Sequence, residues 1–181
     1  MVQSLLILAV APLLFAFPYT AMMPLFANDL LRLGPEGLGI LLSVAAVGAL
    51  VGSAWLSLGG ETKGTGKWLV SSTIALGVFL IMFMFTQTLL TAAVMMFLVG
   101  LASSVYRTMS RVALQTRVPD RLRGRILSIA LMDRGFMPLG AILIGVIAEW
   151  SDALWAGVFM GAGCIAATLA VLAARRRIWT L

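Results

Sequence analysis

Apolar residues occur in six long runs along this chain, and short polar segments separate one run from the next. A helix needs about 20 residues to cross about 30 Å of hydrocarbon, and each run is roughly that long. The connecting segments are short, so consecutive helices are expected to be antiparallel neighbours. The pattern predicts an all-α membrane protein, a single bundle of six transmembrane helices. The predicted spans are about residues 4–26, 37–58, 68–86, 89–110, 126–150 and 153–174.

Positive charge is concentrated between these runs. Ten of the thirteen Lys and Arg residues fall in three stretches, at residues 63–67, 111–125 and 175–177. If the apolar runs cross a bilayer, all three stretches lie on the same side, and basic loops mark the cytoplasmic side. We therefore expect both termini to be cytoplasmic and the protein to lie in a cell membrane, namely a bacterial inner membrane.

Composition narrows the class further. Hydrophobic residues make up 61% of the chain and charged residues 11%, whereas soluble domains average about 45–50% and about 25%. A net charge of +6 would often indicate a nucleic-acid partner. Here the excess charge flanks apolar spans, so anionic lipid headgroups explain it better. The lipid bilayer is the expected partner, and nucleic acid is not.

Several kinds of chemistry have no residues to support them. The chain contains no histidine, which excludes Ser–His dyads and histidine ligation of zinc or haem. Residues 64–67 only faintly resemble a phosphate-binding loop, because the spacing, the preceding strand and the hydroxyl after Lys67 are missing. The single cysteine, Cys164, lies inside the last span and is expected to be a small packing residue. No enzyme activity, metal site or cofactor is predicted.

The segment between the fourth and fifth spans reads QTRVPDRLRGRILS over residues 115–128. Pro119 cannot donate a backbone hydrogen bond, Asp120 can cap the next helix and Gly124 allows a tight turn. Arg123 and Arg125 suit the headgroup layer. The segment resembles the loop between helices ten and eleven of the major facilitator superfamily, in the branch of drug and siderophore exporters that includes the enterobactin exporter. Three further segments resemble that branch in order: MPLFA at 23–27, LGPEGLG at 33–39 and PLG at 138–140.

This resemblance implies an architecture. Such transporters have twelve helices in two six-helix halves, and the motifs here belong to the C-terminal half. The chain is therefore expected to be a fragment, the product of a truncated gene, or a subunit that needs an N-terminal half or a homodimer partner. The first and fourth spans would line the central cavity, the second and fifth would lie beside them, and the third and sixth would face lipid.

The resemblance also assigns gating roles to the cytoplasmic loops. Residues 59–67 resemble a decayed copy of the superfamily's gating signature, in which Glu61, Gly64 and Lys67 stand near the acidic, glycine and basic positions. In the family this loop braces neighbouring helices and helps to gate conformational change. The loop between the fourth and fifth spans contributes five further candidates: Pro119, Asp120, Arg123, Gly124 and Arg125.

One carboxylate lies deep within a predicted span. Counting from Arg125 at about 1.5 Å per residue places Asp133 about 12 Å deep, where a charge costs about 2.5–3.5 kcal/mol and requires a partner. Arg134 points about 100° away around the helix, whereas Arg107 has a side chain long enough to reach down toward Asp133. Asp133 is therefore either a protonation switch that couples proton release to substrate movement, or half of a fixed ion pair between two spans.

The first span contains three prolines, Pro12, Pro18 and Pro24. In lipid such kinks are tolerated where protein or a wet cavity satisfies the freed carbonyls. Tyr19, beside the middle kink, is interpreted either as a substrate contact or as a packing residue. Two pairs of glycines four residues apart predict close helix packing within the bundle: Gly48 with Gly52, and Gly157 with Gly161.

Two functions from different classes remain. The first, implied by the resemblance, is transmembrane transport by the C-terminal half of a proton-coupled exporter of small amphipathic molecules, of drug or siderophore type. The second is a six-helix membrane scaffold or assembly subunit without transport of its own. The deep Asp133–Arg134 pair and the kinked first span favour the exporter, because a scaffold has little need of either. Candidate residues of the substrate and proton path are Asp133, Arg134, Arg107 and Tyr19.

Overall fold

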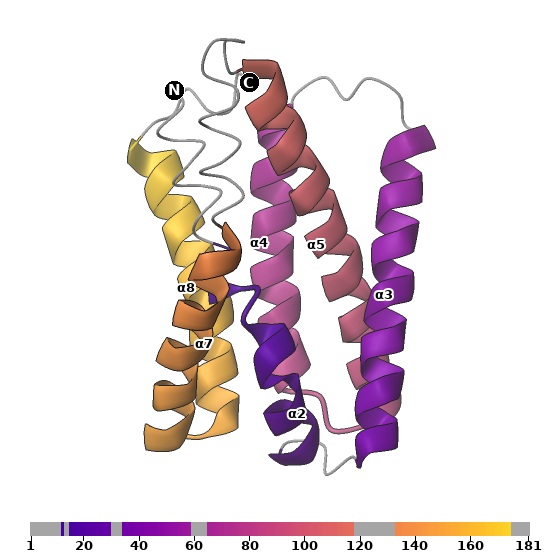
Figure 1. Cartoon of the computed structure of the whole chain (residues 1–181), viewed down its shortest axis with the longest axis vertical. Helices are drawn as coiled ribbons and strands as arrows, with labels where there is room; N and C mark the ends of the chain where they lie inside the picture. Colours follow the sequence, from indigo (N-terminus) through magenta and orange to yellow (C-terminus); the bar gives the residue numbers. More distant parts are fainter. Residues whose placement is uncertain (1–11, 13–14, 30–33, 59–64, 118–132, 175–181) are drawn as a thin grey trace.

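The computed structural model describes residue 12 and residues 15–29, 34–58, 65–117 and 133–174. Within these ranges the elements are helices, and no strand occurs among them. The long helices α3, α4, α5 and α8 run side by side, and those that follow one another in the chain are antiparallel (Figure 1). The helices are α2 (Tyr19–Asp29), α3 (Pro35–Leu58), α4 (Thr65–Met84), α5 (Leu89–Arg117), α7 (Asp133–Trp150) and α8 (Ala153–Ala174).

Four of these helices are long and apolar enough to cross a membrane: α3, α4, the Leu89–Val112 part of α5, and most of α8. The fully described part of α7, Pro138–Trp150, is apolar, and residues 126–132 of the predicted fifth span lie outside the described residues. An all-α membrane protein is therefore confirmed as the fold class. A count of six crossings within one bundle stays a prediction.

The helix starts follow from local chemistry. α3 begins with Pro35, whose missing N–H costs nothing in the first turn, and the Gly34 carbonyl accepts from the Leu38 N–H at 3.2 Å. α5 begins after Thr88, whose side-chain oxygen accepts a hydrogen bond from the Thr91 N–H at 3.3 Å. This is an N-cap, which satisfies one of the unpaired donors at a helix start. The tight connection between α4 and α5 is thus as predicted.

The helices differ from the predicted spans in two places. α5 continues to Arg117, about two turns beyond the predicted span end at residue 110, because residues such as Arg111 and Gln115 favour helix and Pro119 comes only later. In the first span the helix is interrupted directly before α2, at the predicted middle kink.

α4 lies at the centre of the row of long helices, between α5 and α8, and α3 packs on the far side of α5 (Figure 1). Half of the most apolar window of α4 is buried, against 28% for α3. The resemblance implied that the third span faces lipid, and this stays a prediction for the complete transporter. Within this bundle, however, α4 is the most enclosed of the four long helices, because neighbours cover two of its sides.

The long helices approach one another closely where glycines meet. A Cβ atom at Gly48 of α3 would overlap the Phe97 carbonyl of α5, and one at Gly100 of α5 would overlap a carbonyl of α3. Between α4 and α8, Cβ atoms at Gly77 and Gly161 would lie 2.8 and 2.6 Å from each other's carbonyl oxygens. These contacts confirm that the paired glycines serve packing inside the bundle.

Among the described residues, four serine and threonine side chains are buried in the bundle, and each donates a hydrogen bond to a carbonyl of its own helix. Cys164 of α8 is fully buried, as predicted for a packing residue, and its thiol points across the interface to the carbonyl of Thr73 in α4 at 3.8 Å. The hydroxyl bonds are Ser72 to Leu69 at 3.0 Å, Thr73 to Leu69 at 2.7 Å, Ser103 to Gly100 at 2.8 Å and Thr168 to Cys164 at 2.7 Å.

Candidate functional site at the break in the first span

The backbone of the first span is interrupted at a turn formed by Ala16, Phe17 and Pro18. The N–H groups of Ala16 and Phe17 both donate to the Pro12 carbonyl at 2.8 Å, and Pro18 has no N–H to continue the ladder. Helical bonding restarts through the Tyr19 N–H, which donates to the Ala16 carbonyl at 3.2 Å. The predicted middle kink is therefore a full break, and α2 begins directly after it.

Phe17 anchors this break to the rest of the bundle. Its side chain is 1% exposed and belongs to a buried cluster with Leu69 and Val70 of α4 and Tyr106 of α5. The rings of Phe17 and Tyr106 have their centroids 5.9 Å apart at an interplanar angle of 44°. This is within the distance range of favourable aromatic pairs. The broken segment is thereby held against α4 and α5 by an aromatic side chain.

Arg107 of α5 lies on the same ring. The central carbon of its guanidinium is 4.2 Å from the Phe17 ring centroid, a cation–π contact within the usual limit of about 6 Å. Arg107 as a whole is an exposed residue. It lies within the apolar segment Leu89–Val112 of the described part of α5. A positive charge therefore lies inside the apolar part of α5, next to the break in the first span.

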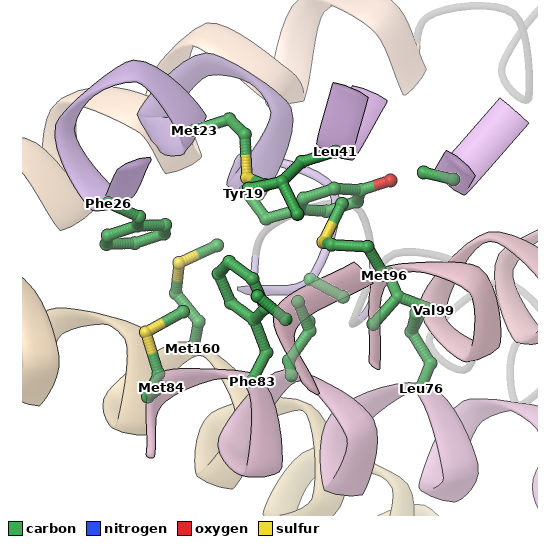
Figure 2. Close-up of a cluster of buried hydrophobic side chains, with 14 of the residues drawn as sticks. Tyr19, Met23, Phe26, Leu41, Leu76, Phe83, Met84, Met96, Val99 and Met160 are labelled. Atoms are coloured by element: carbon green, nitrogen blue, oxygen red, sulfur yellow. The ribbon is translucent and has the colours of Figure 1, made fainter. Parts of the chain in front are cut away.

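Tyr19 belongs to the larger buried cluster next to this contact. Its ring is 7% exposed and lies near Met23, Leu41 and Met96 (Figure 2). Tyr19 stands two residues after Phe17, the ring that Arg107 contacts, so two of the predicted path residues lie in one region. The burial of the ring agrees with the packing interpretation, and a substrate contact by its hydroxyl stays a prediction.

The other predicted site residues are placed less fully. Asp133 and Arg134 are the first two residues of α7, but their side chains lie outside the described part, so the predicted approach of Arg107 to Asp133 stays a prediction. Lys67 is exposed in the first turn of α4. Seven predicted gating residues lie outside the described residues: Glu61, Gly64, Pro119, Asp120, Arg123, Gly124 and Arg125.

Sequence reasoning missed Phe17 and Tyr106. Phe17 directly precedes Pro18, and Tyr106 directly precedes Arg107. The helical conformation is disfavoured for the residue before a proline, so a helix break was most to be expected at Phe17. That signal marks the backbone. It does not reveal that the Phe17 ring packs against Tyr106 and Arg107 of α5, about 90 positions away in the sequence.

Charge is divided between the two ends of the bundle. The described basic residues Lys67, Arg107 and Arg111 lie near the start of α4 and the end of α5, which Figure 1 places at the same end. Glu36 and Glu149 lie at the start of α3 and the end of α7, at the opposite end. The helix ends next to the three basic stretches thus share one face, as the predicted topology requires.

An all-helical bundle with four helices long and apolar enough to cross a membrane indicates a multi-pass membrane protein, and the comparison with known families agrees. Residues 1–180 match the family described as "transmembrane secretion effector", and the chain belongs to this family of major facilitator transporters. Membership confirms the resemblance seen in the loops. This family is one of transporters and not of enzymes, and membership in it does not favour the scaffold.

A curated relative is similar over nearly the whole chain. The staphyloferrin A transporter of Staphylococcus aureus (strain NCTC 8325 / PS 47) is 29% identical over 177 residues, which cover 98% of this chain and 43% of that protein. The chain therefore spans less than half the length of the relative it matches. No solved structure matches the chain.

Proposed function

We propose that this chain is the C-terminal six-helix half of a proton-coupled exporter of small amphipathic molecules of drug or siderophore type. Family membership supports transport, and the relative named for staphyloferrin A transport supports the substrate class. The missing partner is an N-terminal six-helix half or a second copy of the chain. The distribution of charge between the two ends supports a bacterial inner membrane location with both termini in the cytoplasm.

One observation carries the proposal most directly, the Arg107 guanidinium stacked on Phe17 at 4.2 Å. Charged side chains inside membrane spans are rare, and they mark substrate or ion pathways. Backbone breaks at membrane depth are tolerated where they are buried in protein or line a water-filled cavity. Here both features occur together, between the first and fourth spans that the family architecture places along the central path.

Proton coupling is assigned to Asp133. A carboxylate is protonated more readily when desolvated and less readily beside a guanidinium, so alternating access can release its proton on one side. Arg107 and Arg134 are the neighbouring cations proposed for this role. The gating loops that contain Lys67 and Arg125 would then open and close the cytoplasmic end of the path.

Everted membrane vesicles test this proposal. The chain is produced alone and together with the N-terminal half of the staphyloferrin A transporter, and uptake of ethidium and of staphyloferrin A is followed while a pH gradient is applied and then collapsed. We expect gradient-dependent uptake in the wild type and none in Asp133→Asn, with equal amounts of protein in the membrane. Gradient-independent uptake, uptake unchanged in Asp133→Asn, or no uptake in either arrangement would refute the proposed function.

A further inference from the structure

Resting on the proposed transport function, we propose that Arg107, backed by Phe17 and adjoining Tyr19, forms a binding site for an oxyanion of the substrate. The transported molecules would then be amphiphiles that carry a carboxylate or phosphate group. The site consists of the Arg107 side chain from α5 together with Phe17 and Tyr19, the residues directly before and after Pro18. It therefore exists only where the first span breaks.

The chemistry of the guanidinium supports this site. A guanidinium is planar, and its N–H donors lie in the plane and point outward from its edges. The central carbon of the Arg107 guanidinium lies 4.2 Å from the Phe17 ring centroid, and a phenyl ring has no oxygen or nitrogen acceptor, so this contact does not occupy the N–H donors in conventional hydrogen bonds. Those edges match the two oxygens of a carboxylate or phosphate in a bidentate pair, a geometry that lysine cannot provide.

The supporting ring is itself fixed. Phe17 is 1% exposed and packed against Tyr106, Leu69 and Val70, and its backbone is held at the turn by the hydrogen bond to Pro12. Arg107 is therefore stacked on a surface that does not need to be ordered when a ligand arrives. Preorganisation of this kind raises affinity by reducing the ordering that binding requires.

Tyr19 and its neighbours suit the remainder of an amphipathic ligand. Tyr19 stands two residues after Phe17 in the chain, and its hydroxyl is both a donor and an acceptor. Around the Tyr19 ring lie Met23 and Met96, which are fully buried in the bundle (Figure 2). Flexible thioether side chains can repack against apolar groups of different shape, so the apolar part of a ligand would enter here by displacing this packing.

The same oxyanion chemistry could come from a lipid phosphate. Arg107 is exposed and lies toward the basic end of α5, where a long side chain can reach lipid headgroups. The experiment must therefore separate a soluble ligand from a lipid headgroup.

Binding is measured on the full chain in dodecyl maltoside, with 4-phenylbutanoate and its uncharged methyl ester as probes. Melting followed by tryptophan fluorescence gives an apparent Kd for each probe. We expect only the carboxylate to bind, with about tenfold or greater loss of affinity in Arg107→Gln, as for other charge-assisted hydrogen bonds. Arg111→Gln, at an exposed position one turn away on the same helix, is the matched control and should change Kd less than about twofold.

Two further variants separate charge from geometry. Arg107→Lys keeps the positive charge but loses the pair of parallel N–H donors. Phe17→Leu keeps an apolar side chain in the core but loses the aromatic ring. Both variants should weaken carboxylate binding several-fold. If Phe17→Leu does not fold, the two arginine variants still decide. Equal binding of acid and ester, or equal losses in Arg107→Gln and Arg111→Gln, would overturn the site.

Nanodiscs identify the source of the oxyanion. An unchanged Kd for 4-phenylbutanoate in phosphatidylcholine and phosphatidylglycerol discs supports a substrate site. A tenfold higher Kd in phosphatidylglycerol for the wild type would assign Arg107 to a lipid phosphate and overturn the substrate assignment. Because binding is measured without transport, loss of transport with intact binding counts against the exporter alone. Transport without Arg107-dependent binding counts against this site alone.

Discussion

Replacing Gly48 by alanine should push α3 away from α5. The added Cβ would overlap the Phe97 carbonyl oxygen and lie 2.9 Å from its carbon and 3.1 Å from the Phe97 Cα. These are backbone atoms of a helix, so they cannot move aside as a flexible side chain does. Restoring ordinary van der Waals contact requires the two helices to separate by roughly 0.5–1 Å, a gap that forfeits a quarter to a half of the dispersion energy of each affected contact.

The expected loss is about 1–3 kcal/mol of unfolding free energy, the usual range for overpacked interiors. Gly39→Ala in the same helix is the control, because nothing lies within 4 Å of a Cβ at that position. There the better helix propensity of alanine should leave stability unchanged or raise it by up to about 1 kcal/mol. Unfolding in mixed dodecyl maltoside and dodecyl sulfate micelles, followed by circular dichroism, measures both variants.

A double-mutant cycle tests whether Gly48 and Gly100 act at the same interface. Gly100→Ala would open the same interface from the α5 side, so combining it with Gly48→Ala should cost less than the sum of the two single losses. Equal stabilities of Gly48→Ala and Gly39→Ala, or strict additivity in the cycle, would show that α3 and α5 are not held by this close backbone contact.

Three other results are expected. Thr88→Ala should lower the free energy of unfolding by about 1 kcal/mol through loss of the N-cap to the Thr91 N–H, whereas Thr88→Ser should keep most of that stability. An equal loss in both variants, measured by the same unfolding assay, would exclude the cap. Cys164, being 0% exposed, should resist maleimide in the folded protein and react fully after denaturation; rapid labelling of folded protein would contradict its burial against Thr73. Asp133→Asn should abolish gradient-driven export while expression stays normal, and full export by this variant would exclude a protonation switch.

Much of the fold could be predicted from the sequence because apolar runs of membrane length leave the backbone few alternatives. α3, α4 and α8 occupy the predicted runs closely, and the packing role of Gly48 and Gly161 follows from their spacing. Helix ends were predicted less well where hydrophobicity and helix propensity separate, as at the end of α5. There the predicted span ends at residue 110 and the helix continues to Arg117.

The candidate site could be predicted only in part. Pro18 marks a kink, but whether the helix bends or stops depends on what packs into the gap, and here Phe17 fills it. The chain contains nine phenylalanines, and nothing local distinguishes the one that meets Arg107. Polar residues in apolar spans stand out in the sequence, so Arg107 and Tyr19 could be found, whereas their aromatic support depends on tertiary contacts.

The buried hydroxyls have a consequence for motion. Each of Ser72, Thr73, Ser103 and Thr168 bonds to a carbonyl of its own helix, so none of these bonds breaks when one helix slides along another. Between α4 and α8 the thiol of Cys164 makes only a weak contact with the Thr73 carbonyl at 3.8 Å. The two helices therefore pack closely but have few bonds that resist sliding along their length, which lowers the energy barrier to shear between α4 and α8.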